Sequence, residues 1–196
     1  MLNNKLKDYN IILASASPRR HAFLKSMNID FEVRLHPVDE VYPNTLKGTE
    51  ITDYLAILKA EAFKNQLKDK DILITSDTIV WLDNKPVEKP KDKDDAFRMI
   101  KLLSNKTHEV MTSICFTQPT QQKIVNTITK VTFKALRDDE IWYYVNKYEP
   151  LDKAGAYGIQ EWIGAIGITN IEGSYNNVVG LPTHLLYETL NTIANT

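Results

Sequence analysis

The feature that most constrains the fold is the direct passage from an apolar strand to a helix near the start of the chain. The stretch "YNIILAS" (9–15) is apolar and β-branched, as is typical of a buried strand. Ser17 and Pro18 then supply a favourable N-cap and a favourable first helical residue. This pattern predicts a strand that is followed at once by a helix over about residues 18–27.

Strand and helix patterns continue to alternate along the chain. We expect strands at 31–35 and 71–82, a long hairpin formed by 107–117 and 124–134, and helices at 50–67, 93–103, 138–147 and 183–194. The helix at 50–67 has the clearest pattern, an apolar stripe made by Ile51, Tyr54, Leu55, Leu58 and Ala62. Six of the seven glycines lie between residues 155 and 180, which favours tight turns joining short strands there. The alternation predicts an α/β or mixed α+β fold, and no repeat or linker divides the chain, so we expect one domain over 1–196.

Composition limits the partners that we expect. The net charge of −1 gives no overall field that would attract a nucleic-acid polymer or a membrane surface. No run approaches the roughly 18 apolar residues needed to cross a bilayer, and the first residues lack the apolar stretch of a secretory signal peptide. Cys115 is the only cysteine, which excludes an internal disulfide and fits a reducing compartment. We therefore expect a cytoplasmic protein.

Two arginines occupy an unfavourable place at the start of the helix predicted for 18–27. A helix N-terminus carries a partial positive charge, so Arg19 and Arg20 each cost about 0.3–1 kcal/mol if they are merely exposed there. The alternative is a bound anion, held by free helix N–H groups and arginine side chains. The small residues 14–17 would let such a ligand approach the backbone. These residues alone leave both interpretations open.

Four more side chains are candidates for chemistry. Asp77 follows a buried strand pattern and is either a carboxylate that holds a cation or a water, or the cap of a turn. Lys59 lies at the flank of the apolar helical stripe, where it either keeps its charge in water or directs it to the same ligand as the arginines. Lys89 lies in a polar turn and by itself is typical of a surface lysine. Glu40 lies in a loop between two prolines and is a candidate second metal ligand.

Taken together, these residues resemble a known family. The matching blocks are "ILASASPRR", "VDE" with Glu40, "LAILKAEA" with Lys59, "SDTIVWLDNKPVEKP", "LSNKTHEVMT", "EPLDKAGAYGIQ" and "GSYNNVVGLP". They occur in order from residue 11 to about residue 190 and resemble the Maf family of nucleoside triphosphate pyrophosphatases. The resemblance implies hydrolysis of a nucleoside triphosphate to its monophosphate and pyrophosphate with a divalent metal cation, Mg²⁺ or Mn²⁺. It also implies a two-lobed single domain, with a central twisted mixed sheet flanked by helices and an active-site cleft between the lobes, and often a homodimer.

The resemblance assigns roles by position. Asp77 matches the catalytic carboxylate of the family, and Glu40 and Asp77 would hold the metal. The positions tied to substrate choice are Arg19, Thr78 and Gln160. The positions that line the phosphate and metal site are Ser15, Arg20, Glu40, Lys59 and Lys89. Under this interpretation Asp77 acts as a base or as a metal ligand, and the arginines face a triphosphate.

The segments "AGAYGIQ" and "GSYNNVVGLP" resemble the subgroup that acts on dTTP and UTP. Two residues depart from the family pattern: Glu161 and Asn105 stand where many members have glycine. Two alternatives remain beside the hydrolase, a nucleotidyltransferase and a non-catalytic nucleotide-binding regulator of cell division. The stiff "SASP" turn disfavours the transferase, because transferases place a glycine-rich loop after the first strand.

Overall fold

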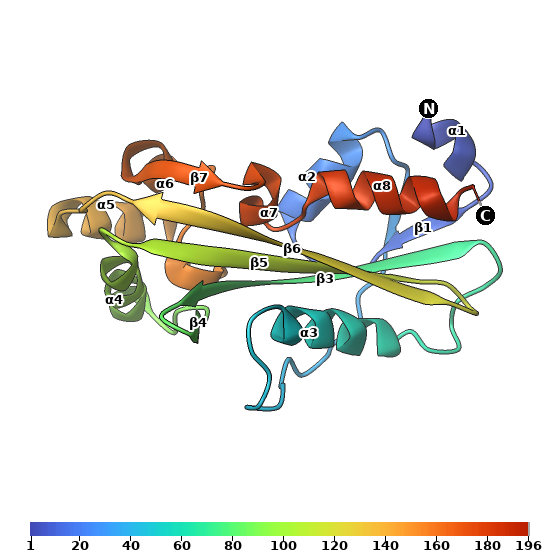
Figure 1. The fold of residues 1–196 in the computed structure, drawn as a ribbon, viewed down its shortest axis with the longest axis horizontal. Coiled ribbons are helices and arrows are strands. Elements are labelled where there is room, and N and C mark those ends of the chain that lie inside the picture. Colours follow the sequence, from blue (N-terminus) through green and yellow to red (C-terminus); the bar gives the residue numbers. More distant parts are fainter. Residues whose placement is uncertain (196) are drawn as a thin grey trace. The chain divides into compact units, whose positions relative to one another are not determined.

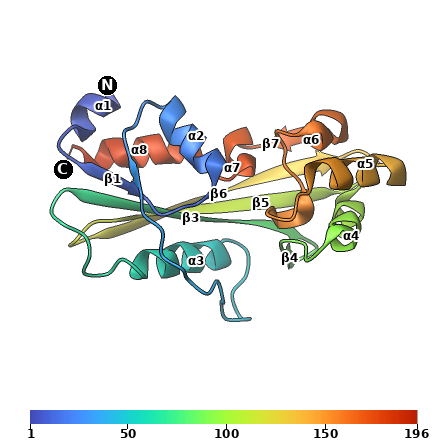
Figure 2. The same cartoon turned by 180° about the vertical axis from the view of Figure 1, so that it is seen from behind.

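A computed structural model describes residues 1–195 of the chain (Figures 1 and 2). These residues form two units. Unit 1 comprises Met1–Asp77, Thr112–Thr127 and the segment from Gly180 onward, and unit 2 comprises Thr78–Met111 and Ile128–Val179. The two units correspond to the expected two lobes, whereas the single domain over 1–196 and the cleft between the lobes stay predictions. Across residues 1–195, every helix is too short or too polar to cross a membrane.

A mixed sheet connects the strands of the chain, as expected. The strands are β1 (Asn10–Leu13), β2 (Glu32–Val33), β3 (Asp71–Leu82), β4 (Lys85–Val87), β5 (Thr107–Thr117), β6 (Gln122–Phe133) and β7 (Ile168–Glu172). Their order in the sheet is β2-β1-β3-β5-β6-β7, and β4 pairs with β3. β1 is parallel to β2 and to β3, whereas the pairs β3–β4 and β6–β7 are antiparallel. The predicted fold class, a mixed sheet flanked by helices, is therefore confirmed.

In unit 1, alternate residues of the strands face two separate hydrophobic cores. Ile11 of β1 and Ile72 of β3 face one core, together with the helices α1 (Leu2–Leu6), α2 (Pro18–Ser26) and α8 (Thr183–Ile193). Ile12 and Leu73, one residue further along each strand, face the other core, against α3 (Thr49–Glu61). The strand period of two residues explains this division. Figures 1 and 2 show α2 and α8 on one face of the sheet and α3 on the opposite face.

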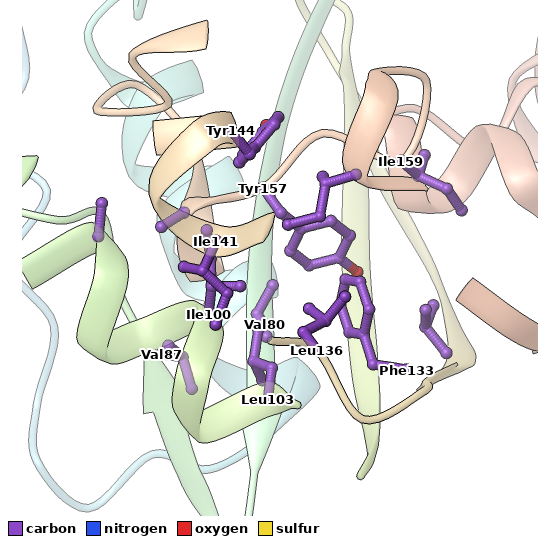
Figure 3. Packing of buried hydrophobic residues seen from close by; sticks show 14 of the residues in the cluster. Val80, Val87, Ile100, Leu103, Phe133, Leu136, Ile141, Tyr144, Tyr157 and Ile159 are labelled. Carbon is purple, nitrogen blue, oxygen red and sulfur yellow. The ribbon is translucent and has the colours of Figure 1, made fainter. Parts of the chain in front are cut away.

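In unit 2, one core is built around the helices α4 (Lys93–Leu103) and α5 (Asp138–Tyr148), followed by η1 (Ala154–Ala156), α6 (Trp162–Gly167) and α7 (Tyr175–Val179). Figure 3 shows Ile100, Leu103 and Ile141 packed beside Val80 of β3. Tyr144 belongs to the same core and is fully buried. The hydroxyl of Tyr144 therefore lies in an apolar core, where it requires hydrogen-bond partners.

The structure confirms most of the predicted elements. The helices predicted at 18–27, 93–103, 138–147 and 183–194 correspond to α2, α4, α5 and α8, whose ends agree to within one residue. The strand predicted at 71–82 is β3, and the predicted hairpin is formed by β5 and β6. Local sequence signals explain this agreement: β3 has a long run of apolar residues, and α2 begins with an N-cap serine and a proline.

The prediction for the helix at 50–67 is wrong in its length and right for only part of its buried face, since Ile51 and Leu55 are buried as predicted. α3 ends at Glu61, and Asn65 adopts a left-handed conformation with φ 67°. Tyr54 is exposed, whereas Thr52, Ala56 and Ala60 are buried. Small side chains let the helix approach the sheet closely, and the buried Thr52 hydroxyl is satisfied by the Ser113 Oγ at 2.6 Å. The buried face of α3 thus combines large apolar residues with small ones, which the apolar stripe alone did not indicate.

The prediction of turns joining short strands between residues 155 and 180 is also wrong. This segment contains η1, α6 and α7 besides the strand β7. Gly164 lies inside α6, where a Cβ atom would stand 1.9 Å from the Ile159 carbonyl oxygen. Gly173 and Gly180 do adopt positive φ angles of 129° and 120°, as expected of glycines in turns. Some of the glycines therefore permit close helix packing, and others permit turns.

Candidate active site

Asp77 lies within a strand and not at the end of one, because β3 continues to Leu82. This agrees with the strand predicted over 71–82, in which Asp77 is a polar residue near the centre. β1 pairs with β3 as far as Ile74, and β4 pairs with β3 from Val80 onward. Asp77 lies between these two paired stretches, beyond the carboxyl end of β1, and is 6% exposed. Ligands of open α/β sheets gather at the carboxyl ends of parallel strands, so this position on β3 suits a functional carboxylate.

A single ammonium group joins Asp77 to Glu40. Lys59 Nζ lies 2.6 Å from Asp77 Oδ1 and 3.0 Å from Glu40 Oε1. The side chain of Lys59 is only 17% exposed, so its charge lies against the two carboxylates and away from bulk water. α3 positions Lys59 and β3 positions Asp77, while Glu40 belongs to the loop between β2 and α3. Glu40, Lys59 and Asp77 therefore form one cluster in unit 1.

Arg20 connects three segments of unit 1. Its Nε donates to the Gly180 carbonyl at 2.9 Å, and its Nη1 donates to the Ser76 carbonyl at 2.8 Å and to Ser15 Oγ at 3.4 Å. Ser15 Oγ also accepts from the Ser17 backbone N–H at 3.2 Å. Ser17 is the N-cap of α2, as predicted, but its own side chain makes no capping hydrogen bond. The "SASPRR" segment is thus tied to the strand that carries Asp77.

Burial and three neighbouring charged side chains determine the pKa of the Arg20 guanidinium. Burial lowers the pKa of Arg20, the carboxylates of Asp77 and Glu40 act to raise it, and the neighbouring charge of Arg19 acts to lower it. An arginine keeps its proton under such conditions because its ordinary pKa is so high. The cations Arg19, Arg20 and Lys59 stand against the carboxylates Glu40 and Asp77, an excess of one positive charge. Such a cluster attracts an anion.

The remaining predicted site residues belong to unit 2. Thr78 directly follows Asp77 on β3, Lys89 is exposed after β4, and Gln160 is exposed before α6. The Gly155 N–H donates to the Glu88 carbonyl at 3.0 Å, so the loop of Lys89 is joined to the segment that leads to Gln160. The structure thus brings together Ser15, Arg19, Arg20, Glu40, Lys59 and Asp77 in unit 1, and it places Thr78, Lys89 and Gln160 in unit 2.

Three residues that sequence reasoning did not select support the site in unit 1. The Gly180 carbonyl accepts from Arg20, and the signal by which it could have been found is its place as the last glycine of the block "GSYNNVVGLP". His21 Nε2 lies 2.6 Å from the Ser15 carbonyl oxygen. Ser76 is 1% exposed, and its Oγ has no hydrogen-bond partner among residues 1–195. Nothing in the sequence pattern sets His21 or Ser76 apart from ordinary helix and strand residues.

The donor set fits a hard divalent cation that is shared with a ligand. Within the described part of the chain, no group of three or more His, Cys, Asp or Glu side chains is arranged to hold a metal. Glu40 and Asp77 offer two carboxylates that already converge on one cation, Lys59. Mg²⁺ is usually bound by one or two carboxylates, with waters and substrate phosphates completing its shell. These residues therefore fit Mg²⁺ or Mn²⁺ bound together with a phosphate, and they do not fit a closed structural zinc site.

Comparison with known proteins identifies the family of the chain. The sequence model described as Maf-like protein matches residues 10–193. A dTTP/UTP pyrophosphatase of Flavobacterium johnsoniae is 58% identical over 193 residues, which cover 98% of this chain and 100% of the relative. A dTTP/UTP pyrophosphatase of Flavobacterium psychrophilum is 58% identical over 187 residues, 95% of this chain and 96% of the relative. Among solved structures, the Ham1 protein of Staphylococcus aureus shares the fold, with a TM-score of 0.56 and 18% identity over 94% of this chain and 99% of that chain. The resemblance noted in the sequence is thus confirmed, and the chain belongs to the Maf-like protein family.

Proposed function

We propose that this protein hydrolyses nucleoside triphosphates, foremost dTTP and UTP, to the monophosphate and pyrophosphate. One observation carries the proposal: relatives that are 58% identical over nearly the whole chain bear the name dTTP/UTP pyrophosphatase. The charged cluster of unit 1 supports it, because cations beside a buried carboxylate suit a phosphate ester and an attacking water.

In the proposed reaction, a water oxygen forms a bond to the α-phosphorus while the bond from that phosphorus to the bridging oxygen breaks. Lys59 occupies Asp77 Oδ1, which leaves Oδ2 to orient the water and accept its proton. Arg19, Lys59 and Lys89 neutralise the charge that develops on the leaving pyrophosphate. Arg20 adds charge, and it also holds Ser15 and the Ser76 carbonyl in place through its hydrogen bonds.

Glu40 and Asp77 are the residues that would hold a divalent cation, Mg²⁺ or Mn²⁺. When bound, such a cation supplies Lewis-acid neutralisation of phosphate oxygens. Lys59 contacts both carboxylates and so holds them close to each other.

Gln160 is proposed to read the base. Its side chain is exposed, and its amide has no hydrogen-bond partner among residues 1–195. Uracil and thymine present an N–H donor flanked by carbonyl acceptors, and a glutamine amide can pair with that edge through one acceptor and one donor. A glutamine can also rotate its amide to suit other bases, so Arg19 and Thr78 are proposed to contribute to the choice.

The decisive experiment measures pyrophosphate release from UTP and Mg²⁺, with and without a sugar phosphate acceptor. Release without the acceptor supports the hydrolase. Release that depends on the acceptor would indicate a nucleotidyltransferase, and nucleotide binding without release would indicate a regulator. A parallel sample in excess EDTA tests the metal: activity should disappear there and return with added Mg²⁺ or Mn²⁺, and full activity in EDTA would contradict metal assistance.

We place the reaction in the cytoplasm, which is supported by a sole cysteine, Cys115, that is buried and unpaired with any other cysteine. A homodimer is part of the proposal through the family resemblance alone. Size-exclusion chromatography with light scattering tests it, and a monomeric mass at micromolar concentration would contradict it.

A further inference from the structure

A buried hydroxyl in unit 2 holds the short turn that carries Gln160, here called the 158–161 turn. Tyr144 of α5 is fully buried. Its hydroxyl accepts a hydrogen bond from the Gly158 backbone N–H at 3.0 Å and donates one to Glu161 Oε2. The two ends of the turn, one on each side of Gln160, are therefore joined through a single oxygen atom.

The Glu161 carboxylate has a second partner. Its Oε1 lies 3.3 Å from Lys153 Nζ, and these side chains are only 19% and 11% exposed. An ion pair with so little exposure is weakly screened by solvent, and the loss of one partner leaves the other charge poorly solvated. Glu161 is the N-cap of α6, yet its side chain makes no capping hydrogen bond. The carboxylate is therefore directed to Tyr144 and Lys153 and away from its own helix.

Backbone contacts make the same turn tight. The Glu161 N–H donates to the Gly158 carbonyl at 3.0 Å, and the Glu161 carbonyl accepts from the Gly164 N–H at 3.0 Å. A Cβ atom on Gly158 would stand 2.8 Å from the Glu161 carboxyl carbon and 3.0 Å from Gln160 Nε2. The side chains of Glu161 and Gln160 thus both lie over Gly158, so a displacement of one changes the space that is open to the other.

We propose that Glu161 is a positioning residue for base selection: through Tyr144 and Lys153 it holds the 158–161 turn in one conformation and so sets the direction of the Gln160 amide. The inference rests on the proposed function, in which Gln160 reads the base. Burial raises the pKa of the Tyr144 hydroxyl, and the hydrogen bond to Glu161 raises it further, so the hydroxyl keeps the proton that it donates. Direct contact between Glu161 and the nucleotide is not required.

The first test measures the turn itself, without any nucleotide. Glu161→Ala removes the carboxylate that accepts from the Tyr144 hydroxyl, and Tyr144→Phe removes the hydroxyl itself. In both variants the amide hydrogen exchange of Gly158 should become at least about tenfold faster. Glu172→Ala is the matched control, because Glu172 is an exposed carboxylate of unit 2 with a single lysine partner, Lys130, at 3.6 Å. Unchanged exchange at Gly158 in both variants would overturn the inference. If Glu161→Ala does not fold, Glu161→Gln, which keeps the length of the side chain and loses its charge toward Lys153, replaces it.

The second test measures base selection. In Glu161→Ala we expect KM for UTP to rise about tenfold with kcat within about twofold, and the preference for UTP over CTP to fall. The double variant Gln160→Ala/Glu161→Ala should be no less selective than Gln160→Ala, because an absent amide cannot be positioned. Equal losses for all nucleotides, or additive losses of selectivity in the double variant, would overturn the inference.

The two proposals fail in different ways. If the wild-type protein releases no pyrophosphate from any nucleotide, the proposed hydrolase is wrong. UTP and CTP binding to the wild type and to Glu161→Ala, measured by calorimetry, then replaces the kinetic test. An unchanged ratio of the two dissociation constants in Glu161→Ala would overturn the role of Glu161.

Discussion

Lys59 shows how much one side chain decides in this protein. Its ammonium lies within 3.0 Å of both Glu40 and Asp77, which come from a loop and from a strand. The positive charge of Lys59 offsets the repulsion between the two carboxylates and holds them on one point. A divalent cation could take the same place between them.

Asp77→Asn should abolish turnover and leave nucleotide binding largely intact. Asparagine keeps the shape of the side chain and can still accept from Lys59, but it is not a base and is a poorer metal ligand. We expect kcat for UTP to fall at least tenfold, which corresponds to a barrier increase of at least about 1.4 kcal/mol. Asp83→Asn changes a carboxylate in the exposed turn after β3 and serves as the control. If Asp77→Asn keeps more than about a tenth of wild-type kcat, Asp77 is not central.

Lys89→Ala should lower kcat/KM for UTP by about tenfold or more, because the exposed ammonium is proposed to neutralise the leaving pyrophosphate. Lys91→Ala is the matched control: Lys91 is also exposed and lies two residues further along the same loop. The measurement is initial-rate kinetics at several UTP concentrations for both variants. Equal activity of Lys89→Ala and Lys91→Ala would reduce Lys89 to an ordinary surface lysine.

At the scale of elements, small departures from regular structure set where strands and helices end. Asp83 and Asn84 both adopt positive φ angles, 50° and 62°, as a two-residue turn between the paired strands β3 and β4 requires. Asn105 adopts φ 58°. Asparagine tolerates the left-handed region better than most residues, so Asn105 can occupy the position at which the family resemblance leads us to expect glycine.

Gly164→Ala should destabilise unit 2 by about 1–3 kcal/mol, the usual cost of overpacking. Its Cβ atom would stand 1.9 Å from the Ile159 carbonyl oxygen, a backbone atom that cannot move without shifting the 158–161 turn. Urea unfolding of Gly164→Ala, beside the exposed neighbour Ala165→Ser, measures the loss. A change below about 0.5 kcal/mol would mean that the start of α6 adjusts freely.

At the scale of the whole molecule, long strands supply residues to both units. β3 contributes Asp71–Asp77 to unit 1 and Thr78–Leu82 to unit 2, and β5 and β6 are divided in the same manner. Two adjacent residues of one strand, Asp77 and Thr78, thus belong to different units.

Stability should fall as the pH falls from about 6.5 toward 4, because His108 is buried and neutral in unit 2. Its Nε2 lies 2.7 Å from the Tyr157 hydroxyl, and burial lowers the pKa of His108 from 6.5 to about 4. Above pH 6.5 His108 is neutral in both the folded and the unfolded chain, so its protonation does not reduce the free energy of unfolding. Between pH 6.5 and pH 4 His108 binds a proton in the unfolded chain but stays neutral in the folded chain. The free energy of unfolding therefore falls, by roughly 2 kcal/mol at pH 5.

Urea unfolding at pH 7 and pH 5 checks this prediction. The free energy of unfolding of His108→Gln should depend less on pH than that of the wild type, by roughly 2 kcal/mol over this interval. The comparison concerns the pH dependence alone, since the variant also loses packing against Phe133. An identical pH dependence in the two proteins would show that another group is responsible.

Local sequence patterns were enough to predict most of the helices and strands and the charged residues of the site. The Ser17-Pro18 helix start and the apolar run of β3 are such local signals, because each depends on neighbours within one or two turns. The family resemblance likewise follows from residues in order along the chain. Tertiary packing decided that α3 also buries Ala56 and Ala60 and leaves Tyr54 exposed. It also decided that Lys59 joins Glu40 to Asp77 and that Tyr144 holds the 158–161 turn. Such contacts join residues far apart in the chain, and they form only when packing has brought the elements together.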